Sequence, residues 1–235
     1  MLVAKSGLAE SRERAQALIL AGKVRVQGET VRRPDRAVAE DAQVAVDVEP
    51  GYASRGALKL APALDALGVD PAGRVCADIG ASTGGFTDVL LRRAATKVYA
   101  VDVGRGLMHW RLRQDPRVVL MERVNARELE SFPEPVSLVV IDVSFISLDK
   151  VLPAVQRAAP EAEVVALFKP QFEVGRAEVG KGGVVRDQST IGAALERFHA
   201  WCAANGYLVI DQARSEITGA EGNREVFVHL RPLKA

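Results

Sequence analysis

Two acids that flank a cluster of glycines have the types and spacing of a nucleotide-binding site. A short apolar run ends on Asp78, breaks into a loop that holds Gly80, Gly84 and Gly85, and restarts as an amphipathic segment. A chain that leaves a strand for a helix must turn tightly, and glycine permits both this turn and the close approach of a ligand. The next apolar run ends on Asp102, 22 residues after Gly80, where such folds place a carboxylate on ribose hydroxyls. The pattern predicts a ribose-bearing cofactor.

The details of the loop discriminate between cofactors. No Gly-Lys-Ser/Thr follows it, so the lysine and hydroxyl of a P-loop are missing. Its glycine spacing also departs from the G-x-G-x-x-G that binds a pyrophosphate, which weakens the alternative of a nicotinamide-dependent oxidoreductase. S-adenosylmethionine has no phosphate, and Asp78 meets the need of its amino-acid end for an acid. In the simplest alternative, Asp78 and Asp102 are only turn residues at strand ends.

Alternating strands and helices are expected to position these residues. The expected strands are Val75–Ile79, Lys97–Asp102, Val118–Met121, Val136–Asp142 and Glu163–Phe168, and the expected helices are Gly84–Ala95, Leu148–Ala158 and Ser189–Asn205. This alternation predicts a parallel sheet that is covered on both faces and binds ligands at the carboxyl ends of its strands. Tyr207–Ala213 and Glu225–Leu230 flank a turn-rich stretch, which predicts a hairpin and an antiparallel last strand. By fold analogy, this ending favours a Rossmann-like α/β methyltransferase over a dehydrogenase.

Composition agrees with a cytoplasmic enzyme. The 235 residues are 48% apolar and 26% charged with a net charge of +1, enough for one α/β domain and a small appendage. We find no cationic leader with an apolar core and no run of 18 apolar residues, so neither export nor membrane spanning is predicted. Cys76 and Cys202 are expected to be reduced core thiols. Three scattered histidines, His109, His199 and His229, lack metal-ligand spacing, and no metal is predicted.

The N-terminal residues differ from the rest in charge and pattern. Ser11–Gly22 is predicted to be a capped amphipathic helix closed by glycine, and Lys23–Gly28 a strand that ends in a turn. Through Arg36 there are eight basic and four acidic residues, a local charge of +4. A small basic module in a nearly neutral protein predicts a polyanionic partner, and an ordinary solvated helix face is the alternative.

Several motifs in one order make a resemblance specific. The N-terminal pattern Ser11-Arg12-Glu-Arg14-Ala15 with Gly22-Lys23-Val24 resembles the S4 RNA-binding domain, and the whole chain resembles the TlyA (hemolysin A) family of S4-plus-FtsJ-like ribosomal RNA 2′-O-methyltransferases. The motifs that carry this resemblance along the chain are Ser54-Arg55-Gly56-x-x-Lys59-Leu60, Asp78-Ile-Gly-Ala-Ser-Thr-Gly-Gly-Phe-Thr87, Asp142-Val-Ser-Phe-Ile-Ser-Leu148, Lys169-Pro-Gln-Phe-Glu173, Gly180-Lys-Gly-Gly-Val-Val-Arg-Asp187 and Gly222-Asn-x-Glu225.

The resemblance implies an S4-like domain at 1–48, a linker and helix start at 49–58, and an FtsJ-like methyltransferase domain at 59–235. It also implies a catalytic tetrad of Lys59, Asp142, Lys169 and Glu225. The substrate that the resemblance implies is a cytidine of ribosomal RNA. The implied partner is ribosomal RNA or a ribosomal subunit, and no obligate protein partner is implied. The S4-like part begins at Met1, where relatives usually carry several more residues of the first helix. Either the start is misassigned or the chain is a short-form member, and the resemblance associates the short form with modification of the large subunit only.

The tetrad residues suit methyl transfer to a hydroxyl. Asp142 and Lys169 each follow an apolar run, so both should emerge at the carboxyl edge of the sheet beside the cofactor. The reaction is an in-line displacement that needs alignment and help for a weakly acidic hydroxyl to lose its proton. A partly desolvated lysine can accept that proton or orient the hydroxyl, and which of the two Lys169 does stays open. Asp142-Val-Ser-Phe145 lacks the two prolines of base-directed enzymes, which favours a ribose target.

The remaining predicted contacts are assigned by position. The glycine-rich loop Gly175–Asp187 follows the strand of Lys169 and is placed to touch substrate phosphates. The predicted cofactor-binding residues are Asp78, Gly80, Ser82, Thr83, Gly84, Gly85, Phe86, Asp102, Val103, Asn125 and Asp142, with Asn125 on the adenine side. The predicted RNA-binding residues are Arg12, Arg14, Lys23, Arg25, Arg55, Arg176, Lys181 and Arg186.

Two other functions compete with this prediction. A membrane-active hemolysin, which the family's older name suggests, would need a spanning segment or a strongly amphipathic cationic helix, and the sequence shows neither. An RNA-binding protein with an inactive transferase domain is disfavoured because all four tetrad positions are occupied.

Overall fold

The computed structural model describes residues 2–9, 11–20, 22–39, 42–46, 51–175, 178–219 and 222–233, and divides the chain into two compact units at residues 1–51 and 52–235. The smaller unit holds α1 (Leu2–Lys5), α2 (Arg12–Leu20), β1 (Val24–Val26), β2 (Glu29–Val31) and β3 (Val44–Val46). Its three strands form an antiparallel sheet in the order β2-β1-β3. A two-residue turn joins β1 to β2, and both Gln27 and Gly28 have positive φ angles, as a type I′ hairpin requires.

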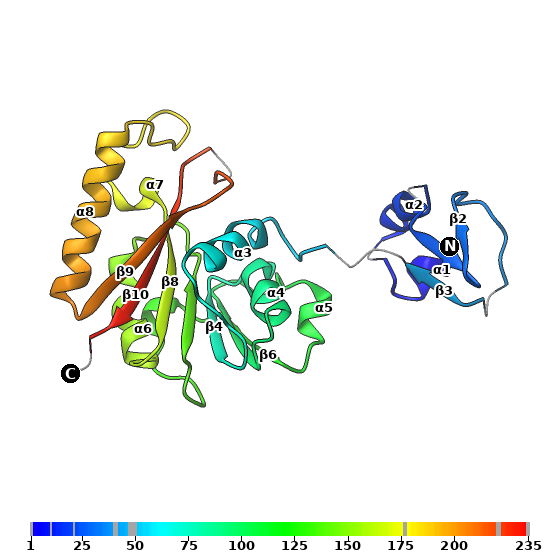
Figure 1. Ribbon diagram of the computed structural model, residues 1–235, viewed down its shortest axis with the longest axis horizontal. Helices are drawn as coiled ribbons and strands as arrows, with labels where there is room; N and C mark the ends of the chain where they lie inside the picture. The colour runs from blue at the N-terminus through cyan, green and yellow to red at the C-terminus, as the bar shows by residue number, and fades with distance from the viewer. Residues whose placement is uncertain are drawn as a thin grey trace. The chain divides into compact units, whose positions relative to one another are not determined.

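The larger unit is built on a seven-stranded sheet (Figure 1). Its strands are β4 (Val75–Ile79), β5 (Lys97–Asp102), β6 (Val118–Glu122), β7 (Leu138–Ile141), β8 (Glu163–Phe168), β9 (Tyr207–Arg214) and β10 (Val226–Pro232). The strand order is β6-β5-β4-β7-β8-β10-β9, and β10 alone runs antiparallel to its neighbours. The predicted fold class, a mostly parallel sheet with an antiparallel last strand, is confirmed.

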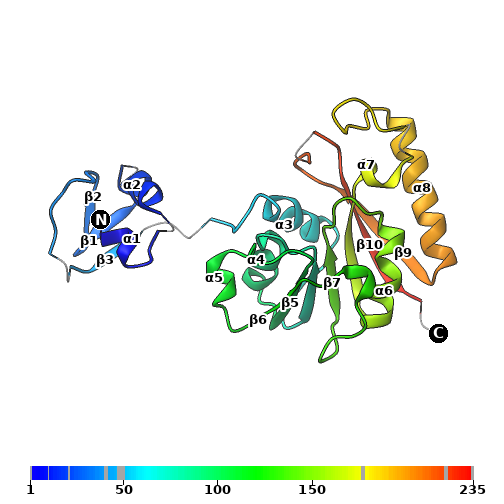
Figure 2. The same cartoon turned by 180° about the vertical axis from the view of Figure 1, so that it is seen from behind.

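Helices cover both faces of this sheet (Figures 1 and 2). They are α3 (Ala57–Ala66), α4 (Gly85–Arg92), α5 (Trp110–Arg113), η1 (Ala126–Glu128), η2 (Leu148–Lys150), α6 (Leu152–Ala158), α7 (Pro170–Glu173) and α8 (Gln188–Ala204). Alternate strand residues pack into two cores: Val139 and Ile141 of β7 face the core shared with α6 and α8, and Leu138 and Val140 face the core shared with α3 and α4. This burial on both faces explains why the strands are continuous apolar runs.

The elements differ from the prediction mainly at their ends. The helix predicted at Leu148–Ala158 is divided into η2 and α6, and α6 begins with a proline in its first turn, a position that proline tolerates. The strand predicted at Val136–Asp142 is confined to β7, and the short helices α5 and α7 were not predicted. Cys76 and Cys202 are buried free thiols, as predicted.

Candidate active site

The glycine loop after β4 is shaped by contacts that only glycine permits. Gly80 has a φ of +87°, and a Cβ there would lie 2.4 Å from the backbone oxygen of Asp142. Gly84 has a φ of +91°, and a Cβ on Gly85, the first residue of α4, would lie 2.3 Å from Ser54 Oγ. The loop therefore packs against the end of β7 on one side and against the segment before α3 on the other.

A pocket of about 280 Å³ opens where these elements meet. Its wall combines the glycine loop and the start of α4 with Asp142, the residues around the start of α3, and the β9–β10 loop. The predicted residues that line it are Arg55, Lys59, Gly80, Ser82, Thr83, Gly85, Phe86 and Asp142. Sequence positions from 55 to 142 thus converge on one hollow at the carboxyl edge of the sheet, as expected for a parallel α/β fold.

Asp102 organises the loop beside a second, smaller hollow. Its Oδ2 accepts a hydrogen bond from Ser82 N at 2.7 Å, and its Oδ1 accepts one from Gly104 N at 2.7 Å. The hollow is lined by Asp102, Glu122 and the apolar side chains of Leu107, Met108 and Leu120 among others. The hollow has a volume of only about 10 Å³, so the feature that agrees with the prediction is the position of the Asp102 carboxylate after β5, where such folds place an acid on ribose hydroxyls.

Asp78 of β4 is fully buried and lines neither hollow. Thr87 Oγ1 donates a hydrogen bond to its Oδ2 at 2.7 Å, and its Oδ1 has no hydrogen-bond partner among the residues that the structure describes. Burial raises the pKa of Asp78 to about 7, the hydrogen bond from Thr87 opposes this rise, and the nearby charge of Asp142 adds to it. A buried carboxylate oxygen without a partner favours a nearby cationic group or a proton.

Lys59 of α3, which lines the pocket, forms an ion pair with Glu225, which directly precedes β10. Lys59 Nζ donates a hydrogen bond to Glu225 Oε2 at 2.6 Å, and the side chains are 14% and 2% exposed. A charge buried to this degree is tolerated only when it is paired. The last strand therefore fixes the lysine of the first helix of this unit.

A second ion pair joins the ends of β7 and β8. Lys169 Nζ lies 2.6 Å from Asp142 Oδ1, and it donates a hydrogen bond to Ser144 Oγ at 3.0 Å. The Asp142 contact lacks the alignment of a hydrogen bond, so Ser144 makes the directed interaction with the amine. Because Lys59 and Asp142 both line the pocket, the two ion pairs bring all four predicted tetrad residues to one site.

The remaining predicted cofactor residues lie elsewhere. Gly84, Val103 and Asn125 contribute to the wall of neither hollow, and Val103 is 74% exposed. The side chain of Asn125 begins η1, where its Oδ1 accepts a hydrogen bond from Arg127 N and its Nδ2 donates one to Glu128. The adenine-side role of Asn125 stays a prediction.

Comparison with known proteins identifies the family. The family model described as FtsJ-like methyltransferase matches residues 52–232, and the model described as S4 domain matches residues 1–44. The chain belongs to the FtsJ-like methyltransferase family. The resemblance given by the sequence motifs is thereby confirmed, and the family makes the larger unit a methyltransferase.

Three relatives of this FtsJ-like methyltransferase extend the comparison over the whole chain. The 16S/23S rRNA (cytidine-2′-O)-methyltransferase TlyA of Mycobacterium tuberculosis is 47% identical, over 97% of this chain and 87% of the relative. Hemolysin A of Brachyspira hyodysenteriae is 39% identical, over 97% of this chain and 96% of the relative. A solved hemolysin-named structure from Streptococcus thermophilus has a TM-score of 0.76 and 41% identity, and covers 100% of this chain and 87% of that one.

Within this FtsJ-like site, two residues that sequence reasoning did not assign flank the tetrad. Ser144 contacts the Lys169 amine, and Phe145 is 92% exposed with a φ of +64°. The Phe145 ring lies 5.2 Å, centroid to centroid, from that of Phe172 in α7. Both residues belong to the Asp-Val-Ser-Phe motif, but an apolar residue after a buried strand is usually expected in the core, so the sequence carried no signal of its exposure.

The predicted RNA-binding residues of the FtsJ-like methyltransferase divide between the two units. Arg12, Lys23 and Arg25 are exposed in the smaller unit, and Arg55, Lys181 and Arg186 are exposed in the larger one. Arg176 and the side chain of Arg14 lie outside the described residues. The described helices include none that is long and apolar enough to cross a membrane.

Proposed function

We propose that this protein transfers a methyl group from S-adenosylmethionine to a ribose 2′-hydroxyl of ribosomal RNA. The observation that carries the proposal is the pair of buried lysine–carboxylate contacts, Lys59–Glu225 and Lys169–Asp142, around the pocket beside the glycine loop. The names of relatives that are 47% identical, which specify cytidine-2′-O methylation of rRNA, support the same reaction and a cytidine as its target.

The residues of the larger unit fit S-adenosylmethionine. The buried, unpartnered Oδ1 of Asp78 is a candidate partner for the ammonium of the cofactor, and Gly80, Ser82, Thr83 and Gly85 of the glycine loop line the pocket that would receive its amino-acid end. Asp102 retains acceptor capacity for ribose hydroxyls, because each carboxylate oxygen has two lone pairs and only one is used. When bound, the cofactor supplies an electrophilic methyl group on a sulfonium.

Lys169 is proposed to act on the hydroxyl that receives the methyl group. Its ammonium has three N–H donors: one makes the hydrogen bond to Ser144, and Asp142 balances the charge from 2.6 Å without the alignment of a hydrogen bond. A donor that Ser144 does not use can orient the hydroxyl oxygen toward the methyl group, and a neutral amine in the same place would accept the hydroxyl proton. Alignment of this kind supplies much of the rate enhancement in a displacement reaction.

Lys59 and Glu225 are proposed to complete the pocket from the opposite wall. Glu225 neutralises Lys59, so the pocket gains a positioned donor without an uncompensated charge. Asp142 pairs with Lys169 and also lines the pocket. Its backbone oxygen lies against Gly80, so Asp142 connects the Lys169 pair to the glycine loop.

The target nucleotide is proposed to stack on Phe145. An exposed aromatic ring is a general platform for an unstacked base, and this ring follows Asp142 by three residues and is braced by Phe172. Turning a nucleotide out of its stack costs a few kcal/mol. An aromatic platform beside the tetrad would offset part of that cost.

The smaller unit is proposed to supply RNA affinity. Its sequence match is to the S4 domain, and the exposed Arg12, Lys23 and Arg25 give it the positive charge that phosphates require. A ribosomal substrate implies that the protein acts in the cytoplasm.

Transfer of label from radioactive S-adenosylmethionine tests the function. The intact protein is incubated with isolated small and large ribosomal subunits, and the RNA is then digested with alkali. A 2′-O-methyl group blocks cleavage of the adjacent phosphodiester, so the proposal expects label in alkali-resistant dinucleotides. Label only in mononucleotides would indicate base methylation, and no label in either subunit would favour an inactive transferase domain.

A further inference from the structure

Two loops of the larger unit are fastened together next to the active site by one buried side chain. Asn223 is 1% exposed. Its Oδ1 accepts a hydrogen bond from Val185 N at 2.9 Å, and its Nδ2 donates one to Gly183 O at 2.8 Å. A buried amide that is satisfied on both sides fixes its neighbours, because breaking either bond leaves an unpaired buried group. Asn223 therefore holds the segment before α8 against the segment before β10.

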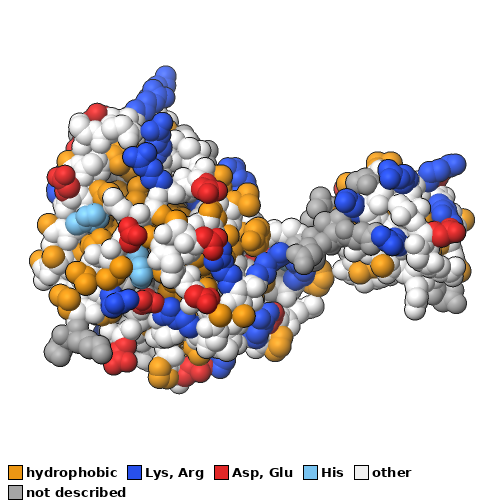
Figure 3. All heavy atoms as spheres, viewed as in Figure 1, with side chains coloured by type: hydrophobic (Ala, Val, Ile, Leu, Met, Phe, Trp, Pro, Cys, Tyr) orange, Lys and Arg blue, Asp and Glu red, His pale blue; other side chains and the backbone are white. Residues whose placement is uncertain are grey.

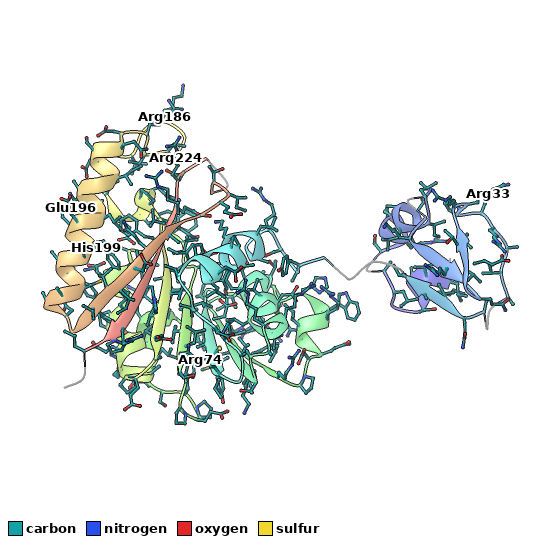
Figure 4. The ribbon with its side chains drawn as sticks, viewed as in Figure 1. Arg33, Arg74, Arg186, Glu196, His199 and Arg224 are labelled. Carbon is teal, nitrogen blue, oxygen red and sulfur yellow. The ribbon has the colours of Figure 1, made fainter. Side chains whose placement is uncertain are left out.

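The fastened loops enclose a hollow of about 290 Å³ with a cationic rim. The hollow is lined by Val184, Val185, Arg186, Gln188, Gly222 and Arg224. Arg186 follows Val185, whose amide is bonded to Asn223, and Arg224 follows Asn223 itself. The hydrogen bond therefore fixes the backbone next to both arginines, although their side chains are exposed. Figure 4 shows both on the upper side of this unit, where Lys and Arg side chains also gather in the space-filling view (Figure 3).

These two arginines have no acidic partner among the described residues, whereas seven of the 14 other described arginines of the unit form an ion pair. Arg74 pairs with Glu163, Arg93 with Asp65, and Arg113 with Glu122. No ion pair of this kind involves Arg186 or Arg224 in the part of the chain that the structure describes.

The acid closest in sequence to Arg186 is engaged elsewhere. Asp187 accepts hydrogen bonds from Ser189 N and Thr190 N and from both hydroxyls at the start of α8, and these bonds lower its pKa to about 2. Its carboxylate therefore caps the helix. Two guanidinium groups are left to bind an external anion.

The hollow adjoins the proposed catalytic pocket through the chain itself. Arg224 immediately precedes Glu225, whose buried carboxylate pairs with Lys59. Adjacent Cα atoms are about 3.8 Å apart, so the backbone that carries Arg224 lies next to the backbone of a tetrad residue. Arginine binds phosphate through two parallel N–H donors, which fixes orientation as well as position.

We propose that Arg186 and Arg224 form a clamp for a backbone phosphate of the RNA strand that carries the target nucleotide. The clamp rests on the proposed RNA methylation and deepens it by assigning a phosphate site outside the S4-like unit. Asn223 acts as its positioning residue, because it joins the two loops without reaching the phosphate itself.

Charge removal at the clamp, compared with an equal charge removal elsewhere, tests the proposal in the intact protein. We expect the double variant Arg186→Ala/Arg224→Ala to bind rRNA at least 10-fold more weakly and to raise the KM for rRNA similarly. The slope of log K for rRNA binding against log [salt] should be shallower by about 1–2 than for the unchanged protein, as for loss of one or two phosphate contacts. S-adenosylmethionine affinity should stay within twofold.

Arg197→Ala is the matched control. Arg197 is exposed on α8 and lines neither the hollow nor the catalytic pocket, so its removal should leave rRNA affinity and salt dependence within twofold of the unchanged values. Equal effects of the double variant and the control would overturn the clamp. If the unchanged protein methylates no rRNA, the proposed function fails, while the binding measurement with the same rRNA still decides whether the clamp exists.

Discussion

Lys59 and Glu225 are 166 residues apart in the chain, yet their side chains meet at 2.6 Å, with the carboxylate almost fully buried. This contact joins the first helix of the larger unit to its last strand. Because this contact bridges such distant segments, the candidate pocket exists only when the whole sheet, including β10, has formed. Folding and site assembly are therefore one event in this unit.

Removal of the lysine from this pair should destabilise the protein. Lys59→Ala leaves the Glu225 carboxylate buried and uncompensated, and such losses cost about 3–5 kcal/mol of unfolding free energy. Urea denaturation of the two proteins measures the difference. Lys150→Ala is the control, since its partner Asp149 is on the surface and the change should cost less than about 1 kcal/mol. Equal costs for both variants would show that the Lys59–Glu225 contact is energetically unimportant.

Loss of the Asp102 carboxylate should weaken S-adenosylmethionine binding. Asp102→Ala removes the proposed acceptor of the ribose hydroxyls and also frees the amides of Ser82 and Gly104. We expect a loss of about 1.5–3 kcal/mol in binding free energy, the range for charge-assisted hydrogen bonds. Titration calorimetry measures it. Unchanged affinity in a folded variant would remove Asp102 from the cofactor site.

Stability should depend on pH through Asp78. Burial raises its folded-state pKa from 3.8 to about 7, so between these values the folded state binds more protons than the unfolded state. The free energy of unfolding should therefore fall as pH rises from about 4 to about 7, and this contribution should level off above that range. The Asp78→Asn variant lacks this titration, so its stability relative to the unchanged protein should improve from pH 5 to pH 8. A constant difference between the two would contradict the raised pKa.

The sequence predicted the sheet better than the site. Expected and observed bounds agree for Val75–Ile79, Lys97–Asp102 and Glu163–Phe168, because a strand buried on both faces is a continuous apolar run with clear ends. The insertion of β10 between β8 and β9 was not predicted, since it depends on pairing between segments far apart in the chain. Four-residue helices such as α5 are too short for a helical period to be detected.

Within the site, identity was easier to predict than geometry. The tetrad residues followed from motifs that resemble a family, and the structure places their side chains in two contacting pairs. The exposure of Phe145 and the hydrogen bond from Lys169 to Ser144 depend on the backbone path after β7, which turns through a positive φ at Phe145. No residue type there signals such a turn, because glycine, the usual signal, is absent from that position.

The division of labour between the units should be separable. A protein that starts at Gly51 retains the complete seven-stranded sheet and both of its cores, so it should fold and bind S-adenosylmethionine with unchanged affinity. It should lose rRNA methylation. Charge reversal at Arg12 and Arg14 in the full chain should reproduce much of that loss, and rRNA affinity should fall steeply with salt. Full methylation by the shortened protein would transfer recognition to the larger unit.

Substitutions of Ser144 test whether its hydroxyl positions the Lys169 amine. Ser144→Ala removes the aligned hydrogen bond but leaves the ion pair with Asp142, so we expect about a 10-fold loss in single-turnover rate, less than a lost acid-base group would cause. Ser144→Thr keeps the hydroxyl and should restore most of the rate. Equal rates for the alanine variant and the unchanged protein would show that Ser144 does not position the amine.

The role of Lys169 is measured by single-turnover methylation with the Lys169→Ala variant. With rRNA and S-adenosylmethionine both saturating, we expect the variant to transfer methyl groups to alkali-resistant positions at least about 100-fold more slowly, the scale of an acid-base contribution. Its cofactor affinity should stay within a few-fold, because Lys169 acts on the hydroxyl. A rate close to that of the unchanged protein, with cofactor affinity intact, would contradict the assignment of Lys169 to the methylated 2′-hydroxyl.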